Sequence, residues 1–261
     1  MVRYRIESLI GIRHNASLTG MYKTGKTGLA CDLATALADG RPFLGSLAVE
    51  MPQGRIEIWI NDSWARLCAW SGIDENDNSG VARLAAAIDE IKSQAGVAQF
   101  LTTAHTGRPK HDEGTEHARG ATALDDWVDV RMVMTRQGYD PFLFVEGRQV
   151  GMDETQLLFD PVTRRSNIGT GNRATVRTQT GVEIVTEEVA NTPGINKTDL
   201  LAVRARIPGH NQDHADRAIK EATREGKINI VDGFRNSKLH YPGRSPQQQA
   251  ARNLYNSWID H

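Results

Sequence analysis

The sequence predicts an α/β domain with a largely parallel sheet, followed by a small module of two helices and a β-hairpin. Three observations predict this order. A G-x-x-x-x-G-K-T loop occupies residues 20–27, strand and helix patterns alternate up to about residue 165, and a second helical pattern begins near residue 195. We therefore expect an α/β domain over residues 1–165, a linker over 166–194, a module over 195–243 and a tail over 244–261.

The loop at residues 20–27 has the composition of a phosphate-binding loop. Gly20 and Gly25 allow backbone angles that a side chain would disfavour, so successive N–H groups can point at phosphate oxygens. Lys26 supplies a positive charge for the β- and γ-phosphates, and the hydroxyl of Thr27 is placed to bind Mg²⁺. The expected nucleotide-binding residues are Gly20, Tyr22, Lys23, Thr24, Gly25, Lys26, Thr27 and Gly28.

The segments on either side of the loop fit this interpretation. Residues 16–19 can end a strand, and residues 28–38 place Leu29, Leu33 and Leu37 on one face of a helix that stops at Gly40. The positive end of that helix would then face the phosphates. The alternative is a chance turn rich in glycine and lysine.

Further elements follow at regular intervals. Strands are expected at residues 55–62, 97–105, 128–135, 142–148 and 157–161, a helix at 80–95 and a short helix at 121–127. In the C-terminal module, helices near 196–207 and 213–225 precede strands at 227–231 and 238–241. That order is the outline of a winged helix-turn-helix.

Polar residues at strand ends are the candidates for chemistry. Asp62 ends an apolar strand and can hold Mg²⁺, although an ordinary turn aspartate is the alternative. His105 ends the next strand, where it can sense a γ-phosphate or serve a structural role. Arg148 can act as an arginine finger toward a neighbouring subunit, or lie on the surface. The acidic run at residues 74–78 can hold water or metal, or simply form a solvated loop.

The C-terminal module has a modest basic excess that suits contacts with the DNA backbone. Winged helices also dock onto proteins, which leaves that alternative open. The expected DNA-binding residues are Lys197, Arg217, Lys220, Arg224, Arg235 and Lys238.

Composition limits the other possibilities. With 31 basic and 32 acidic residues, the net charge of −1 argues against binding nucleic acid through overall charge. Cys31 and Cys68 match no metal-binding spacing, which favours a reduced cytoplasmic compartment. We expect a soluble protein without a membrane segment.

The chain resembles the RecA-like AAA-family ATPases of phages and plasmids, which are grouped with RepA-type hexameric replicative helicases. Residues 20–27, 58–63, 73–76, 103–107 and 119–124 carry the resemblance. It covers about residues 10–165, and the C-terminal module resembles that of actinobacteriophage members. The resemblance implies a ring-forming ATPase that binds ATP and Mg²⁺ and acts on DNA during replication, in the host cytoplasm if phage-encoded. It implies catalytic roles for Lys26, Asp62, His105 and Arg148, with Thr27 and Asp62 on the metal.

One departure from that family separates the functional hypotheses. Family members carry a strand with a catalytic glutamate between the first helix and the strand that ends in the metal-binding acid. Residues 39–54 are too few for a strand, a helix and a return. Glu50 or Glu57 can substitute for the missing glutamate, although neither lies at a matching position in the sequence. The first hypothesis is an ATP-hydrolysing, helicase-like motor. The second is a non-hydrolysing, nucleotide-responsive DNA-binding or scaffold protein, and the third is a damaged helicase copy with exposed sheet edges.

Overall fold

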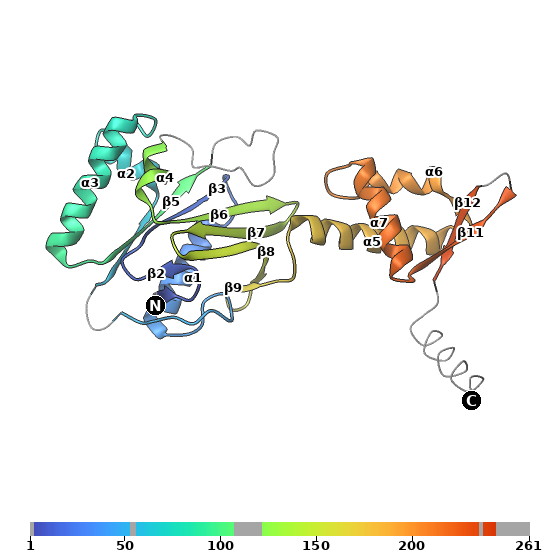
Figure 1. The fold of residues 1–261 in the computed structure, drawn as a ribbon, viewed down its shortest axis with the longest axis horizontal. Coiled ribbons are helices and arrows are strands. Elements are labelled where there is room, and N and C mark those ends of the chain that lie inside the picture. The colour runs from blue at the N-terminus through green and yellow to red at the C-terminus, as the bar shows by residue number, and fades with distance from the viewer. Residues whose placement is uncertain (1–2, 53–55, 107–121, 235–236, 244–261) are drawn as a thin grey trace. The chain divides into compact units, whose positions relative to one another are not determined.

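A computed structural model describes residues 3–52, 56–106, 122–234 and 237–243 of the chain (Figure 1). The chain divides into two compact units, Met1–Arg173 and Ala174–His261. Each unit has its own apolar core. Among the described helices, none is both long and apolar enough to cross a bilayer.

The first unit is built on a seven-stranded mixed sheet with the order β4-β5-β3-β6-β7-β8-β9. Its parallel half contains β4 (Ile58–Asp62), β5 (Gln99–His105), β3 (Asn15–Gly20) and β6 (Val130–Gln137). Its antiparallel half adds β7 (Asp140–Gly147), β8 (Val150–Asp160) and β9 (Arg165–Ile168).

The expectation of an α/β fold is confirmed, whereas the expectation of a largely parallel sheet holds for only half of it. Two residues connect β6 to β7, and two more connect β7 to β8. Connections this short allow only antiparallel neighbours, because a parallel return needs a crossover of a dozen residues or more.

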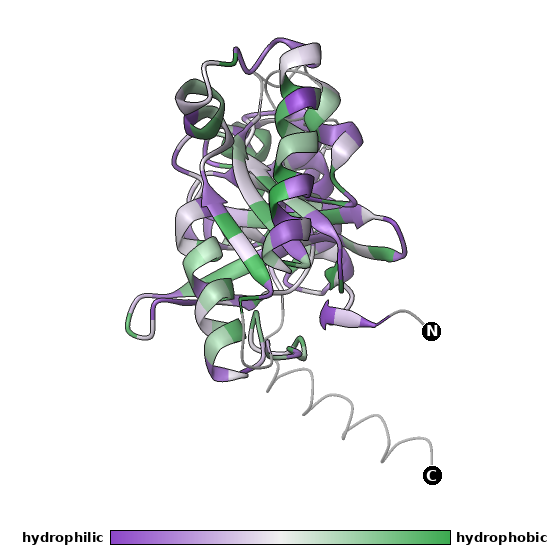
Figure 2. Cartoon of the chain, turned by 90° about the vertical axis from the view of Figure 1, so that its left-hand side faces the viewer, coloured by the Kyte–Doolittle hydropathy of each residue, from purple (hydrophilic) through white to green (hydrophobic). Residues whose placement is uncertain are grey.

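Helices cover both faces of this sheet. The core that contains Leu18 and Leu101 includes α1 (Lys26–Asp39), and the core that contains Phe100 includes α2 (Trp64–Trp70), α3 (Asn78–Ala95) and α4 (Thr122–Trp127). Leu101 and Phe100 are adjacent in β5 and therefore point to opposite faces. The short strands β1 (Tyr4–Ile6) and β2 (Ile10–Gly11) form a separate two-stranded sheet. Figure 2 shows helices that carry both hydrophobic and hydrophilic segments, as helices that cover a core do.

Strand β4 ends the sheet. In the described part of residues 40–57 only isolated bridges occur, Ile6 with Val49 and Phe43 with Leu47, and no strand lies outside β4. Ile56 and Trp59 are accordingly 72% and 42% exposed. The extra strand of the RecA-like family therefore has no counterpart in the part of the chain that the structure describes.

The second unit contains a helix that the sequence analysis did not expect. Residues 166–194 were predicted to be a linker without a clear helix, yet β9 extends to Ile168 and α5 spans Arg173–Asn191. Val182, Val185 and Val189 are completely buried on one face of α5. Valine and threonine have low helix propensity, and packing against the rest of this unit overrides that preference.

The remaining elements of this unit follow the predicted order of helix, helix and hairpin. They are β10 (Ile195–Asn196), α6 (Lys197–Leu200), the 3₁₀ helix η1 (Leu201–Ala205), α7 (Gln212–Arg224), β11 (Ile228–Asp232) and β12 (Lys238–Pro242). The strands form a sheet in the order β10-β12-β11. Ala215, Ala218 and Ile219 of α7 pack in the same core as α5.

Candidate functional site

The glycine-rich loop lies where the parallel strands end and the first long helix begins. Gly20, the last residue of β3, is in register with His105 of β5 and with Met134 of β6. Helix α1 starts at Lys26, directly after the loop. The partial positive charge of its N-terminus is therefore directed at the carboxyl edge of the sheet, where anions bind.

Two glycines of the loop occupy positions that other residues would not tolerate. Gly25 has φ 99°, a left-handed conformation that favours glycine. A Cβ atom on Gly20 would lie 2.6 Å from the carbonyl oxygen of Met134. The hydroxyl of the buried Thr24 donates to the Met21 carbonyl oxygen at 3.0 Å and braces the loop from inside.

The ammonium group of Lys26 lies beneath the loop. Its Nζ donates to the carbonyl oxygens of Gly20 and Met21, each at 2.9 Å. Burial lowers the pKa of Lys26, and the charge of Asp62 opposes this shift. Among the described residues no carboxylate forms an ion pair with Lys26, so its partners are neutral and exchangeable.

Asp62 lies next to Thr27, as the order of the strands predicts. The Thr27 hydroxyl donates to Asp62 Oδ2 at 2.7 Å, and the Thr103 hydroxyl donates to Oδ1. Burial alone would raise the pKa of Asp62, but these two hydrogen bonds, together with Lys26 and His105, lower it below its ordinary value. The carboxylate therefore stays ionised, and the adjacent hydroxyl and carboxylate oxygens are the ligand types that Mg²⁺ prefers.

His105 borders the same edge. It is in register with Gly20, and its ring centroid lies 6.3 Å from that of the exposed Tyr22. The Nζ of Lys23 lies 5.4 Å from the centroid of the Tyr22 ring. The structure thus brings all the predicted loop residues, Asp62 and His105 to one edge of the sheet.

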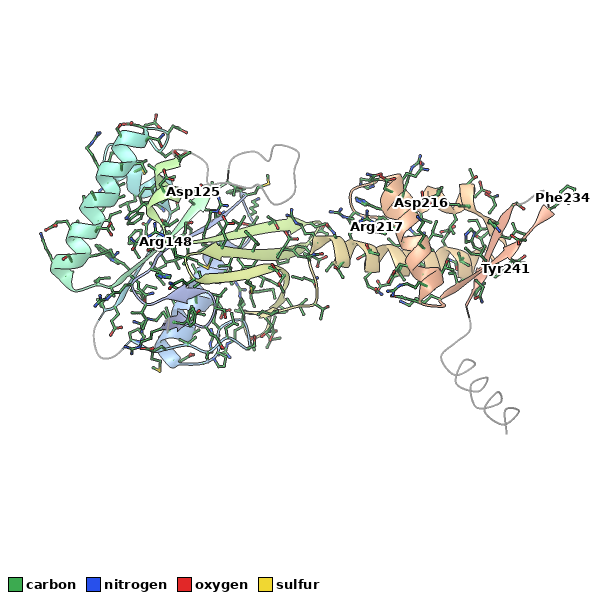
Figure 3. The ribbon with its side chains drawn as sticks, in the orientation of Figure 1. Asp125, Arg148, Asp216, Arg217, Phe234 and Tyr241 are labelled. Atoms are coloured by element: carbon green, nitrogen blue, oxygen red, sulfur yellow. The ribbon has the colours of Figure 1, made fainter. Side chains whose placement is uncertain are left out.

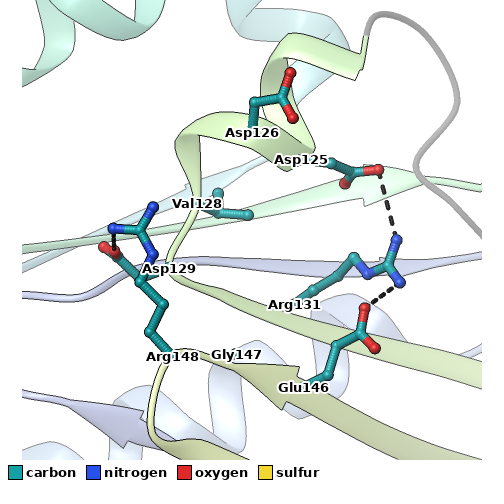
Figure 4. A pocket seen from close by; sticks show the side chains of 8 residues that line it. All are labelled: Asp125, Asp126, Val128, Asp129, Arg131, Glu146, Gly147 and Arg148. Carbon is teal, nitrogen blue, oxygen red and sulfur yellow. Dashed lines mark hydrogen bonds and ion pairs between the residues drawn. The ribbon is translucent and has the colours of Figure 1, made fainter.

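Arg148 lies at the opposite edge. Its guanidinium donates to Asp129 at 3.2 Å, and the Asp129 backbone N–H donates to Asn15, the first residue of β3 (Figure 4). Nearby, Arg131 forms ion pairs with Asp125 and Glu146, and the surrounding pocket measures about 420 Å³. Arg148 is therefore remote from the loop of its own chain.

The acids considered as replacements for the missing glutamate lie elsewhere too. Glu57 precedes β4 at the amino edge and forms an ion pair with the buried Arg5. Glu50 forms an ion pair with Arg3. In the acidic run at residues 74–78, Asp77 caps α3 and Asp74 accepts hydrogen bonds from Asn76 within a turn.

Three of the six predicted DNA-binding cations already have carboxylate partners. Lys197 pairs with Asp216 at 2.7 Å, Arg224 with Glu221, and Lys238 with Asp232. Arg217 and Lys220 form no ion pair with a described residue, and Arg235 lies outside the described residues. Figure 3 marks Arg217 beside Asp216 on α7.

A cavity of about 760 Å³, which was not predicted from the sequence, continues from the loop. It is lined by α1 and by the turns that follow β6 and β8, and it includes Arg136, Tyr139, Phe159 and Arg164. In the sequence, its only signal is an aromatic residue close to an arginine at two places, Arg136 with Tyr139 and Phe159 with Arg164.

The chain matches none of the known protein-family models and none of the curated proteins. Among solved structures it is similar to a KaiC-like protein from the hyperthermophilic archaeon Pyrococcus horikoshii OT3, with 11% sequence identity and a TM-score of 0.39. The match covers 65% of this chain and 100% of the other. At this level of similarity, the assignment of function depends on the geometry of the site itself.

Proposed function

We propose that this chain is a RecA-like P-loop protein that binds ATP with Mg²⁺ at the carboxyl edge of its sheet. The observation that carries the proposal is the 2.7 Å hydrogen bond between the Thr27 hydroxyl and the Asp62 carboxylate. These two oxygens lie directly beside Lys26 and the start of α1. A carboxylate at this position adds a metal ligand to the phosphate-binding N–H groups of the loop.

Each residue then has a defined part in binding. Phosphate oxygens replace the carbonyl oxygens of Gly20 and Met21 as partners of Lys26, and the N–H groups of the loop hold the β-phosphate. Thr27 and Asp62 hold Mg²⁺, which neutralises negative charge on the β- and γ-phosphates. His105 is placed to contact the γ-phosphate from the neighbouring strand.

The wider proposal follows the family resemblance. In it, the protein is a RepA-type, ring-forming replication ATPase, and its C-terminal winged helix binds DNA. The protein is encoded by a phage and acts in the host cytoplasm. Arg148 would then serve the site of an adjacent subunit as an arginine finger. The position of Arg148 at the edge away from its own loop, with a side chain 76% exposed, supports this role.

A second candidate function is a nucleotide-responsive DNA-binding protein or replication scaffold that hydrolyses ATP slowly or not at all. The positions of Glu50 and Glu57 favour it, because both acids are engaged by arginines away from the phosphate loop. No described glutamate hydrogen-bonds to Lys26, Thr27 or Asp62. Among the described residues, therefore, no glutamate is placed beside the loop to polarise the attacking water.

Two measurements test these proposals. Calorimetry with Mg²⁺–ATP should show binding that Lys26→Ala weakens at least about a hundredfold, because a charged hydrogen-bond donor to phosphate is lost. No heat from the folded wild-type protein would refute nucleotide binding. Steady-state ATP turnover, with and without single-stranded DNA, then separates the candidates: turnover equal to that of Lys26→Ala supports the second, and DNA-stimulated turnover supports the first.

A further inference from the structure

The cavity beside the loop has the length and lining of a site for the rest of a nucleotide. On one side it is lined by Thr27, Gly28, Cys31, Asp32 and Thr35, which follow one face of α1. The helix rises about 12 Å from Thr27 to Thr35, which are eight positions apart. A ligand whose phosphates contact the loop would therefore extend along α1 toward the turns after β6 and β8.

Those turns present aromatic rings with arginines beside them. The Tyr139 side chain is 92% exposed and lies 5.8 Å from the guanidinium carbon of Arg136. Arg136 also donates to the carbonyl oxygen of Lys23 at 3.2 Å, which connects this turn to the phosphate loop. Phe159 is 52% exposed, and the guanidinium carbon of Arg164 lies 5.8 Å from its ring centroid. Aromatic rings and guanidinium planes are the surfaces on which bases stack.

Three polar side chains of the cavity wall, those of Thr35, Asp32 and Thr163, already have protein partners. The Thr35 hydroxyl donates to the Cys31 carbonyl oxygen at 2.8 Å. Asp32 forms an ion pair with Arg41 and accepts from the Ser166 backbone N–H at 3.1 Å. The Thr163 hydroxyl donates to Asp160 at 2.6 Å. Among the described lining residues there is no Asn or Gln, the side chains whose amide group pairs with both the donor and the acceptor on the edge of adenine.

We propose that this cavity binds the base of a nucleoside triphosphate by stacking on Tyr139 and Phe159, and that it does not select the identity of the base. The substrate class is then nucleoside triphosphates in general rather than ATP alone. Strong discrimination requires polar groups that are left unpaired by the wrong ligand, whereas stacking accepts every base because each has a π-face. The inference rests on the proposed function, since it places the base of a nucleotide whose phosphates the loop holds.

Calorimetry with Mg²⁺ and five ligands tests this inference. The ligands are ATP, GTP, CTP, UTP and tripolyphosphate, which carries the phosphates without a base. We expect the four nucleotides to bind within about fivefold of one another, and ATP to bind about tenfold more tightly than tripolyphosphate because of stacking. An ATP affinity more than about a hundredfold above those of GTP and CTP would overturn the inference, because only edge reading gives such discrimination.

Variants of the two rings separate this inference from the proposed function. The double variant Tyr139→Ala with Phe159→Ala should bind ATP about as weakly as tripolyphosphate, while its affinity for tripolyphosphate stays unchanged. Val162→Ala is the matched control, because Val162 is 88% exposed on the turn after β8 but does not line the cavity. A double variant that binds ATP like the wild type would overturn the base site alone. Absence of binding to both ATP and tripolyphosphate by the folded wild type would overturn the proposed function with it.

Discussion

The two edges of the seven-stranded sheet hold their charged groups in different ways. At the amino edge, the buried cations have carboxylate partners: Arg5 pairs with Glu57, and Lys92 pairs with Asp89. At the carboxyl edge, Lys26 donates only to backbone carbonyl oxygens, and Asp62 accepts from the hydroxyls of two threonines. At the amino edge, charges are neutralised by other charges of the protein. At the carboxyl edge, Lys26 and Asp62 are hydrogen-bonded, among the described residues, to uncharged groups only.

This difference distinguishes charge that stabilises the fold from charge that is available to a ligand. A buried ion pair is costly to break, because either partner left alone is an uncompensated charge. Neutral hydrogen bonds to carbonyl and hydroxyl groups are worth less, and phosphate or Mg²⁺ can replace them. The comparison therefore predicts that substitutions at the amino edge affect stability, whereas substitutions at the carboxyl edge affect binding.

The largest effect is expected at the amino edge. Arg5 is 2% exposed, and its guanidinium donates to Gln99 at 2.8 Å, to the Glu50 carbonyl oxygen at 2.8 Å and to Glu57. Arg5→Ala leaves these acceptors unpaired, so we expect a loss of about 3–5 kcal/mol in the free energy of unfolding. Urea denaturation measures this loss, and the affinity for Mg²⁺–ATP should not change while the protein remains folded.

Arg3→Ala is the matched control. Arg3 also pairs with a carboxylate, that of Glu50, but its side chain is 71% exposed. Water screens such a pair, so its removal should leave the unfolding transition nearly unchanged. If Arg5→Ala and Arg3→Ala lower the free energy of unfolding equally, burial does not determine the contribution of these ion pairs to stability.

The next largest effect is expected in the affinity for Mg²⁺–ATP. It is tested on two aspartates, Asp62 at the carboxyl edge and Asp89 at the amino edge. Both have a lowered pKa: burial opposes the shift in each, and hydrogen bonds from Thr103 and Thr27, or from Trp127, Lys92 and Asn15, overcome it. Asp62→Asn should weaken Mg²⁺–ATP binding about tenfold and leave binding of Mg²⁺-free ATP unchanged, because only a metal ligand is lost.

Asp89→Asn supplies the control for this pair and should leave both affinities unchanged. Calorimetry with and without Mg²⁺ checks the prediction. An equal loss of affinity in both conditions for Asp62→Asn would show that the carboxylate does not act through the metal.

The sequence alone could predict which residues meet at the carboxyl edge, because each of them directly follows or ends a strand pattern. Asp62 and His105 each end a parallel strand, and such strands end at one edge of a sheet. The amino-edge pairs could not be predicted in this way. Arg5 and Glu57 are 52 residues apart, and nothing in their local sequence indicates that they meet.

The same reasoning explains the other differences from the predicted fold. The valines of α5 are helical only because α7 and its neighbours bury them, and no local preference reveals this. Tyr139 lies in the turn after β6 and Phe159 lies near the end of β8, and only the antiparallel half of the sheet brings them to one cavity. By contrast, the two-residue connections after β6 and β7 could have indicated antiparallel neighbours from the sequence.

The second unit extends the comparison with a smaller expected effect. Lys238 is paired with Asp232, whereas Arg217 and Lys220 have no ion pair with a described residue. If this unit binds DNA, the double variant Arg217→Ala with Lys220→Ala should reduce the slope of log affinity against log salt concentration by about 1–2. Anisotropy of a labelled duplex, measured from about 50 to 200 mM salt, gives this slope. Lys238→Ala should change it less, and the opposite ranking would show that the paired cations contact DNA.

The smallest effect is a dependence of nucleotide binding on pH. Burial lowers the pKa of Lys26 from the ordinary value of 10.5, so the free protein loses this proton at a lower pH than an exposed lysine does. Phosphate binds the charged form, and affinity should therefore be fully present below the lowered pKa and decline as pH rises through it. Calorimetry between pH 7.5 and 9.5 should show an affinity that falls as pH rises, because the ammonium charge is progressively lost. The weak residual affinity of Lys26→Ala should be flat over the same range, since that variant lacks the titrating ammonium group; a parallel decline in the variant would assign the effect to another residue at the carboxyl edge.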